Sequence, residues 1–240
     1  MIGLIKADIR RVCRKKSFKV LMFFMLFFQF VDVLFVTDET ADQIIKNAQS
    51  RLGIIHLMFI TVFIFLCTAA DEKKGNIRAA NIALGFGRTK LVFAKFLEFM
   101  LLLMIFYIFM TPLRIFFYRL LEVPLSDRQL SLIAVYSVFA VIHGIICLMI
   151  AELAELATDS IAVGIITLVS IVVFLTIILR TVEALYKINL YSFVPGGLLN
   201  DAFVNISAGR TPWQLIPVFV YVIVVFAATA ALFGKKEMQL

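Results

Sequence analysis

Long apolar stretches alternate with short polar segments along the whole chain. A helix needs about 20 residues to cross the hydrocarbon core of a bilayer, and slightly shorter stretches are tolerated. The pattern therefore predicts an all-α membrane protein, in which residues 1–240 form a single transmembrane domain with six transmembrane helices. The predicted spans cover residues 20–36, 54–70, 91–111, 131–150, 161–179 and 215–233.

The first 19 residues mix basic and apolar positions and precede the first predicted span. This pattern is typical of an amphipathic helix that lies on an anionic membrane surface, with its apolar side in the lipid and its cations at the headgroups. The basic positions are Lys6, Arg10, Arg11, Arg14, Lys15, Lys16 and Lys19.

The most informative polar segment runs from Asp71 to Lys95, between the second and third predicted spans. Ile77, Ala80 and Leu84 recur at helical spacing and predict a narrow apolar stripe on a short surface helix. Gly85 is expected to end that helix, because glycine adopts the left-handed conformation of a helix end without a Cβ clash. Gly87 then lets the chain turn again. The polar positions Lys73, Lys74, Asn76 and Arg78 are expected to lie off the stripe.

Composition agrees with a membrane protein and argues against several other classes. Hydrophobic residues make up 62% of the chain, which is more than a soluble domain of 240 residues can bury. The formal net charge of +7 is concentrated beside the apolar runs, so nucleic-acid binding is not expected. Most of the 23 Lys and Arg residues fall on the side that carries both termini, which predicts that both termini are cytoplasmic.

The loop from Asp71 to Lys95 resembles the cytosolic loop of ABC-2-type transporter permeases, the membrane subunits of one class of ATP-driven exporter. The resemblance is carried by Glu72, Gly75, Ile77, Arg78, Gly85, Arg88 and Lys95, in that order. It implies that the short helix is a coupling helix, which docks through residues such as Ile77, Ala80 and Leu84 into a separate ATPase. It also implies an elbow helix over residues 1–19 and paired short helices before the last span. The small size is similar to that of permeases for peptide export and bacteriocin immunity in bacterial cell membranes.

Glu152 and Glu155 lie in the short polar turn that follows the fourth predicted span. Two carboxylates three residues apart share a helix face and could hold a metal or perform acid–base chemistry. No His or Cys stands near them, so a solvated turn is the preferred interpretation. The resemblance places a second, smaller contact with the ATPase at this turn.

A few polar side chains fall inside the predicted spans, where they are costly unless they face protein or water. Gln29, Asp32 and His143 are candidates for the translocation path. The alternatives are a carboxylate near the outer surface for Asp32 and one interhelical hydrogen bond for His143. Lys95 and Glu98 are three residues apart, and a local ion pair at the membrane edge is preferred over a transport role.

The segment from Arg180 to Trp213 is too apolar for a solvated loop. Pro195-Gly-Gly197 interrupts it, which predicts a re-entrant hairpin in the outer leaflet.

Two helix starts carry capping boxes: Ser126 with Gln129, and Thr211 with Gln214, the latter with Pro212 at the first helical position.

The chain contains no phosphate-binding loop of the GxxxxGK[ST] type, and the sequence shows no catalytic or metal-binding motif. The resemblance therefore implies a permease without a catalytic site or cofactor of its own, with ATP and magnesium held by a partner. Its expected partners are two copies of an ABC ATPase, a second permease and the lipid bilayer, and the cargo is an amphipathic peptide, lipid or drug. The alternative is an ATPase-independent secondary transporter or a membrane-embedded interaction protein.

Overall fold

The computed structural model describes residues 2–34, 53–74, 77–120, 122–123 and 125–235. These residues form helices and connecting turns, and no strand occurs among them. The elements are α1 (Ile2–Arg14), α2 (Lys16–Leu34), α4 (Gly53–Lys74), α5 (Ile77–Ala83), α6 (Arg88–Leu120), α7 (Asp127–Thr158), α8 (Ile161–Val169), the π-turn η2 (Ser170–Leu175), α9 (Thr176–Tyr186), the 3₁₀ turn η3 (Tyr191–Phe193), α10 (Pro195–Ser207) and α11 (Leu215–Lys235).

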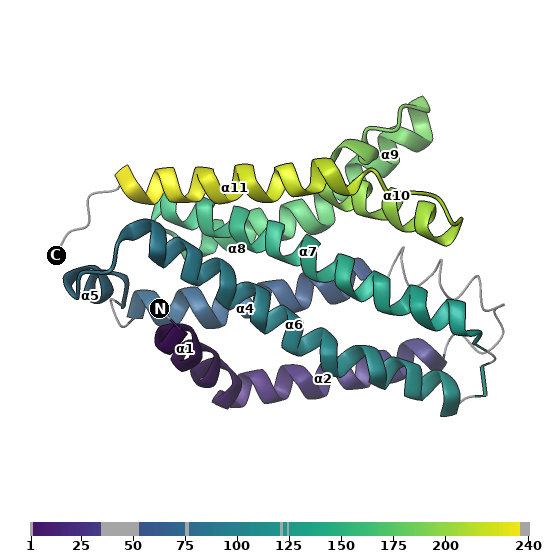
Figure 1. Ribbon diagram of the computed structural model, residues 1–240, viewed down its shortest axis with the longest axis horizontal. Coiled ribbons are helices and arrows are strands. Elements are labelled where there is room, and N and C mark those ends of the chain that lie inside the picture. The colour runs from purple at the N-terminus through teal and green to yellow at the C-terminus, as the bar shows by residue number, and fades with distance from the viewer. Residues whose placement is uncertain (1, 35–52, 75–76, 121, 124, 236–240) are drawn as a thin grey trace.

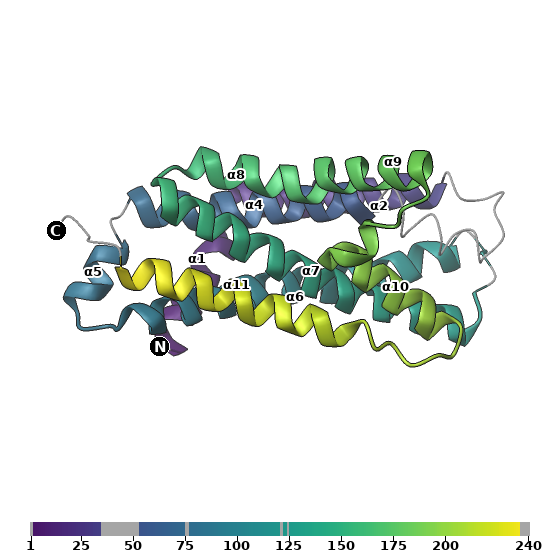
Figure 2. The same ribbon diagram turned by 90° about the horizontal axis from the view of Figure 1, so that it is seen from above.

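The long helices run roughly along one axis, and α7 lies in the centre of the bundle (Figures 1 and 2). Helix α7 packs against α4, α6, α8, α10 and α11. Residues 144–149 of α7 are buried without interruption, so every side of the helix is covered there. A helix that is apolar all round is stable only when other helices surround it, and this explains the central place of α7.

Four helical segments are long and apolar enough to cross a membrane: Arg88–Leu120, Asp127–Thr158, Ile161–Tyr186 and Leu215–Lys235. They correspond to the last four predicted spans. The apolar part of α4, Ile55–Ala70, is shorter. The all-helical architecture and these four segments agree with the prediction of a membrane protein.

Helix α6 continues past the predicted end of the third span. Pro112 lies inside the helix, which extends to Leu120, so the helix is longer than the predicted span of residues 91–111. Proline removes one backbone hydrogen bond from a helix interior, but side-chain packing can outweigh that loss. Arg114 and Tyr118 are buried against the bundle, which shows such packing beyond the proline.

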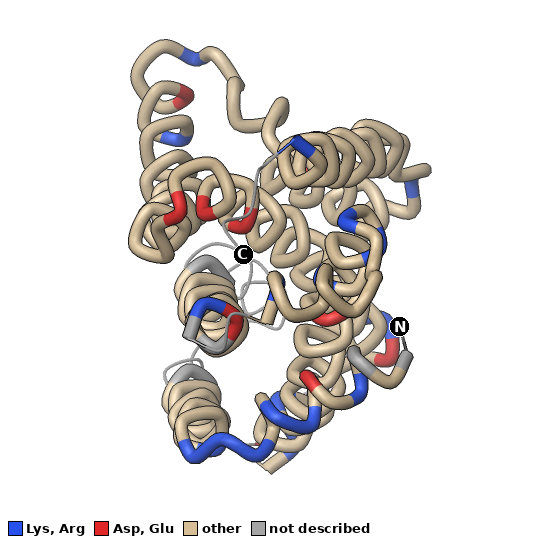
Figure 3. Tube along the Cα trace, turned by 90° about the vertical axis from the view of Figure 1, so that its left-hand side faces the viewer, with Lys and Arg blue, Asp and Glu red and all other residues tan. Residues whose placement is uncertain are grey.

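The N-terminal helix has buried apolar and exposed basic positions, and it is shorter than the predicted residues 1–19. Helix α1 ends at Arg14, and α2 begins directly afterwards at Lys16. Ile5 and Val12 of α1 are buried, whereas Lys6, Arg10 and Arg14 are exposed. Figure 3 views the bundle from the end that carries α5, and many of the Lys and Arg residues at its lower edge belong to this N-terminal region.

Pro195 begins a helix instead of interrupting one. It occupies the start of α10, where its missing N–H is not needed, and the break in the segment lies before it. Gly197 is required by close packing, because a Cβ there would lie 1.7 Å from the carbonyl oxygen of Tyr191.

The two predicted capping boxes have different outcomes. Ser126 and Gln129 form theirs at the start of α7. The last helix begins only at Leu215, after a turn at residues 211–214, so the prediction of Pro212 at the first helical position is wrong. A 3₁₀-type bond from the Leu215 N–H to the Pro212 carbonyl forms the turn instead.

Candidate functional site

The short helix α5 lies at one end of the bundle, between the end of α4 and the start of α6 (Figure 1). It ends at Ala83, and Gly85 has a φ of 84°, in the left-handed region that favours glycine. Helix α6 starts at Arg88, directly after Gly87. The predicted short helix is therefore present, and Gly85 follows its end as expected.

Arg78 of α5 points into the bundle and binds three carboxylates. Its Nε donates to Glu72 Oε2 at 2.7 Å, its Nη1 to Glu155 Oε2 at 2.8 Å, and its Nη2 to Glu152 Oε1 at 2.6 Å. Glu72 belongs to α4, while Glu152 and Glu155 belong to α7. One guanidinium thus joins α5 to two long helices, and its fixed fork of donors sets their relative position.

Lys95 of α6 extends this arrangement to a fourth helix. Its Nζ donates to Glu72 Oε1 and to Glu98 Oε2, the latter at 3.0 Å, and it lies 5.1 Å from the centre of the Phe99 ring. Glu72 is consequently shared, with one carboxylate oxygen for Arg78 and the other for Lys95. We call the group formed by Glu72, Arg78, Lys95, Glu98, Glu152 and Glu155 the charge cluster.

The side chains of the charge cluster are largely removed from solvent, with exposed fractions between 3% and 20%. Burial alone would raise the pKa of Glu72, but the neighbouring charges of Lys95 and Arg78 outweigh burial and lower that pKa below its ordinary value. Burial likewise opposes the charge of Arg78, but Glu152, Glu72 and Glu155 raise its pKa. Glu72 and Arg78 are thus held charged by their neighbours, whereas burial outweighs the neighbouring cations at Glu152 and raises its pKa to about 7.

The charge cluster contains four carboxylates and two cations, so its formal charge is −2 with every group ionised. Two buried oxygens, Glu98 Oε1 and Glu152 Oε2, have no hydrogen-bond partner among the described residues. A cavity of about 40 Å³ adjoins the cluster. Asp8 of α1 lines the same cavity and pairs with Arg11 at 3.0 Å.

Two further contacts tie this end of the molecule together. Lys73, near the end of α4, donates to the backbone carbonyl of Asp159, in the turn after α7. Arg88, at the start of α6, donates to the Gly234 carbonyl at 2.8 Å and to the Phe233 carbonyl at 3.4 Å. The last carbonyls of a helix have no partner within the helix, so Arg88 satisfies those of α11.

The prediction that Glu152 and Glu155 lie in a solvated turn is wrong. Helix α7 continues to Thr158, and both carboxylates are buried within it, each 4% exposed. Their burial is possible because Arg78 supplies the opposite charge at hydrogen-bond distance. The sequence predicts two separate regions of contact with the ATPase, the loop from Asp71 to Lys95 and the turn that carries Glu152 and Glu155. In the structure, the ion pairs of Arg78 join these two regions.

The apolar stripe on α5 is only partly as predicted. Ile77 is half-buried and lines the cavity beside the charge cluster, and the fully buried position is Ala79. Ala80 and Leu84 are exposed, and the Leu84 residue is 76% exposed. Gly75 lies outside the described residues.

Of the three residues predicted for a translocation path, Gln29 and His143 do not line a common cavity. Gln29 is buried in α2. His143 of α7 lines a second cavity that Gln29 does not line. Asp32 belongs to α2, but its side chain lies outside what the structure describes.

Sequence reasoning found the local pair of Lys95 and Glu98 but missed the role of Glu72 as the bridge between both cations. Within the described part of the chain, no group of three or more His, Cys, Asp or Glu side chains is arranged to hold a metal ion.

Comparison with known proteins identifies no relative: no protein-family model, curated protein or solved structure matches this chain.

Proposed function

We propose that the protein is the membrane-spanning permease subunit of an ABC exporter, with ATP hydrolysed by a separate ATPase. The observation that carries the proposal is the bonding of Arg78, on the short helix α5, to Glu72 of α4 and to Glu152 and Glu155 of α7. A helix outside the long bundle is thereby linked to the bundle interior by three ion pairs.

This linkage suits the transmission of a movement. Buried ion pairs keep a fixed geometry, because separating them leaves uncompensated charge in a poorly solvated place. A displacement of α5 by a partner would therefore pull α4 and α7 with it, and through Lys95 also α6. The exposed side of α5, at Ala80 and Leu84, is the surface on which the partner docks in this proposal.

The proposed membrane arrangement has six spans, with α2 and α4 as the first two and both termini in the cytoplasm. The exposed cations of α1 support a cytoplasmic N-terminus, because anionic lipid headgroups and the positive-inside tendency favour Lys and Arg on the cytoplasmic side of the membrane. Helix α10 and the end of α9 form the proposed hairpin at the opposite face. Two permease subunits, identical or related, and two ATPases make up the proposed complex in a bacterial cell membrane, and its cargo is apolar or amphipathic.

The test is recovery of the ATPase with this protein. The tagged full chain is purified from membranes in which the ATPase encoded beside it is co-expressed, and the two proteins are quantified in the eluate. Equal amounts are expected from the complex, with ATP binding only when the ATPase is present. Ala80→Asp should reduce ATPase recovery by about tenfold or more, because an unpaired charge in a desolvated contact costs several kcal/mol.

Ala184→Asp is the matched control, since Ala184 is an equally small, exposed residue on α9 at the other end of the bundle. This variant should retain the ATPase. Ile77 is unsuitable for the test, because it lines the cavity of the charge cluster and its substitution would disturb the fold. Undiminished ATPase recovery with Ala80→Asp, or transport by the purified chain without any ATPase, would refute the proposal.

A further inference from the structure

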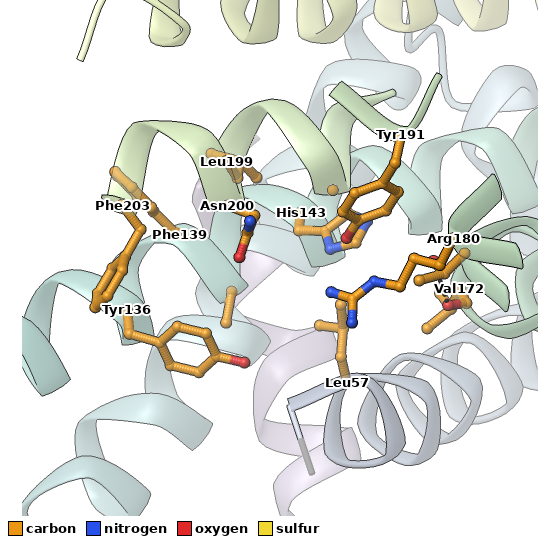
Figure 4. A pocket seen from close by; sticks show the side chains of 13 residues that line it. Leu57, Tyr136, Phe139, His143, Val172, Arg180, Tyr191, Leu199, Asn200 and Phe203 are labelled. Atoms are coloured by element: carbon orange, nitrogen blue, oxygen red, sulfur yellow. Dashed lines mark hydrogen bonds between the residues drawn. The ribbon is translucent and has the colours of Figure 1, made fainter. Parts of the chain in front are cut away.

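A cavity of about 60 Å³ lies between α4, α7, α9 and α10 and shares no lining residue with the cavity of the charge cluster. Polar side chains from three helices line it (Figure 4). They include the hydroxyl of Tyr136 from α7, the guanidinium of Arg180 from α9 and the amide of Asn200 from α10, and His143, Thr176 and Tyr191 line the cavity as well. The fold thus gathers hydrogen-bond donors from distant parts of the chain at one place.

Arg180 supplies a positive charge that no described carboxylate neutralises. It is the only Asp, Glu, Lys or Arg residue among those that line the cavity, and it forms no ion pair with any described residue. Its guanidinium lies 5.0 Å from the centre of the Tyr191 ring, which holds the group in place beside the cavity. A cation in a helix of this composition is costly unless an anion or water accompanies it.

Apolar side chains form much of the remaining wall, among them Leu57, Val172 and Phe203. Such a wall favours a hydrocarbon chain and leaves the polar end of a ligand to the polar side chains. We propose that this cavity binds the carboxylate end of an amphipathic ligand, with Arg180, Asn200 and Tyr136 donating to the carboxylate oxygens.

A carboxylate fits this site better than the phosphate of a phospholipid. The guanidinium fork matches the two oxygens of a carboxylate, and one cation balances one negative charge. A cavity of about 60 Å³ has room for a few waters or one small planar group. A phospholipid phosphate carries a substituent on both sides and needs more space. The carboxylate can come from a fatty acid or from the C-terminus of an apolar peptide.

Binding at this site does not depend on the proposed ATPase, so it is measured on the purified full chain alone. The protein is placed in nanodiscs of neutral phosphatidylcholine, and binding of radiolabelled laurate is followed by equilibrium dialysis. Saturable binding is expected, with no displacement by dodecanol, which has the same chain without the charge. An apolar hexapeptide with a free carboxyl terminus, compared with its amide, distinguishes the peptide source from the fatty-acid source.

Arg180→Gln should weaken laurate binding by about tenfold or more, since charge-assisted hydrogen bonds are about twice as strong as neutral ones. Asn200→Leu removes a donor at similar volume and should weaken binding to a smaller extent. Lys187→Gln is the matched control, because it removes a nearby exposed cation that does not line the cavity. It should bind laurate as the unaltered protein does.

Three results would overturn the inference: displacement of laurate by dodecanol, equal losses in Arg180→Gln and Lys187→Gln, or displacement by phosphatidylglycerol in the nanodisc but not by the free hexapeptide. The last would assign the site to a lipid phosphate. The comparison of laurate with dodecanol uses the unaltered protein, so it decides the question even if Arg180→Gln does not fold.

Discussion

Arg78 Nη2 donates to Glu152 Oε1 at 2.6 Å, although 74 positions of sequence separate the two residues. The bond joins a helix of seven residues to the central helix of the bundle. Because α7 packs against five other helices, a contact with α7 reaches most of the molecule.

Replacing Arg78 with methionine should lower the stability of the protein by about 3 kcal/mol, because three buried carboxylates lose their shared counter-charge. The melting temperature in one fixed detergent, followed by circular dichroism, reports the loss. Arg78→Lys should be intermediate, since it keeps the charge without the fork of donors. Arg10→Met removes an exposed cation and should change little. Equal melting temperatures for Arg78→Met and Arg10→Met would contradict the structure.

The ionised form of Glu72 should stabilise the fold in a pH-dependent way. Its pKa in the folded protein is below the ordinary value of about 4.3, so its stabilising effect is fully present above that pH and is lost as pH falls through the folded pKa. The difference in stability between the unaltered protein and Glu72→Gln should therefore be constant from neutral pH down to about pH 5 and shrink at lower pH.

Melting temperatures across this pH range measure the effect. Glu122→Gln is the control, because Glu122 is exposed and lies outside the charge cluster. The difference in melting temperature between Glu72→Gln and the unaltered protein could instead stay constant down to the lowest pH measured. That result would show that Lys95 and Arg78 do not hold the Glu72 carboxylate in its ionised form.

Gly197→Ala should destabilise the protein by at least about 2 kcal/mol, since the new Cβ would overlap the backbone carbonyl of Tyr191 and neither group is flexible. Gly234→Ala should be close to neutral, because nothing lies within 4 Å of a Cβ at that position. Thermal unfolding of both variants provides the comparison. If the two variants melt together, α10 does not pack against the Tyr191 backbone as described.

Single cysteines at Lys90 and Lys187 test the orientation of the bundle, in a background without Cys13, Cys67 and Cys147. Both positions are exposed, and they belong to opposite ends of the molecule (Figure 1). With cytoplasmic termini, an impermeant thiol reagent should label position 187 on intact cells and position 90 only after the membrane is opened. The reverse labelling pattern would invert the proposed topology.

The features predicted correctly from sequence are those with a local cause. Gly85 ends a helix because of its own backbone freedom, and Ser126 caps one through a residue only three positions away. Apolar length alone located the four helical segments that are long and apolar enough to cross a membrane. Helix ends were less predictable: Pro112 is a helix breaker by its own preference, but packing of Arg114 and Tyr118 carries the helix through it.

The charge cluster could not be assembled from spacing, because the ion pairs of Arg78 with Glu152 and Glu155, and that of Lys95 with Glu72, cross long sequence distances. Glu152 and Glu155 carry no local signal that distinguishes a solvated turn from a buried helix end. Their partner Arg78 was recognised only as part of a loop pattern. The available hint was an energetic one: charged residues next to apolar runs need counter-charges, and Arg78 and Lys95 were the cations at the same end of the predicted spans.

The π-turn at Ser170–Leu175 lies in the middle of the helical segment Ile161–Tyr186. Hydrogen bonds from i to i+5 enclose one more residue than those of an α-helix, so this segment contains a surplus residue. Deleting one residue within Ser170–Leu175 would let the turn close to α-helical geometry, with Arg180 still directed into its cavity. The same deletion within Ile161–Val169 would rotate everything that follows by about 100°, because an α-helix has about 3.6 residues per turn. The segment therefore tolerates shortening at one place, and that place lies between the part of the helix that packs on α4 and α7 and the part that carries Arg180.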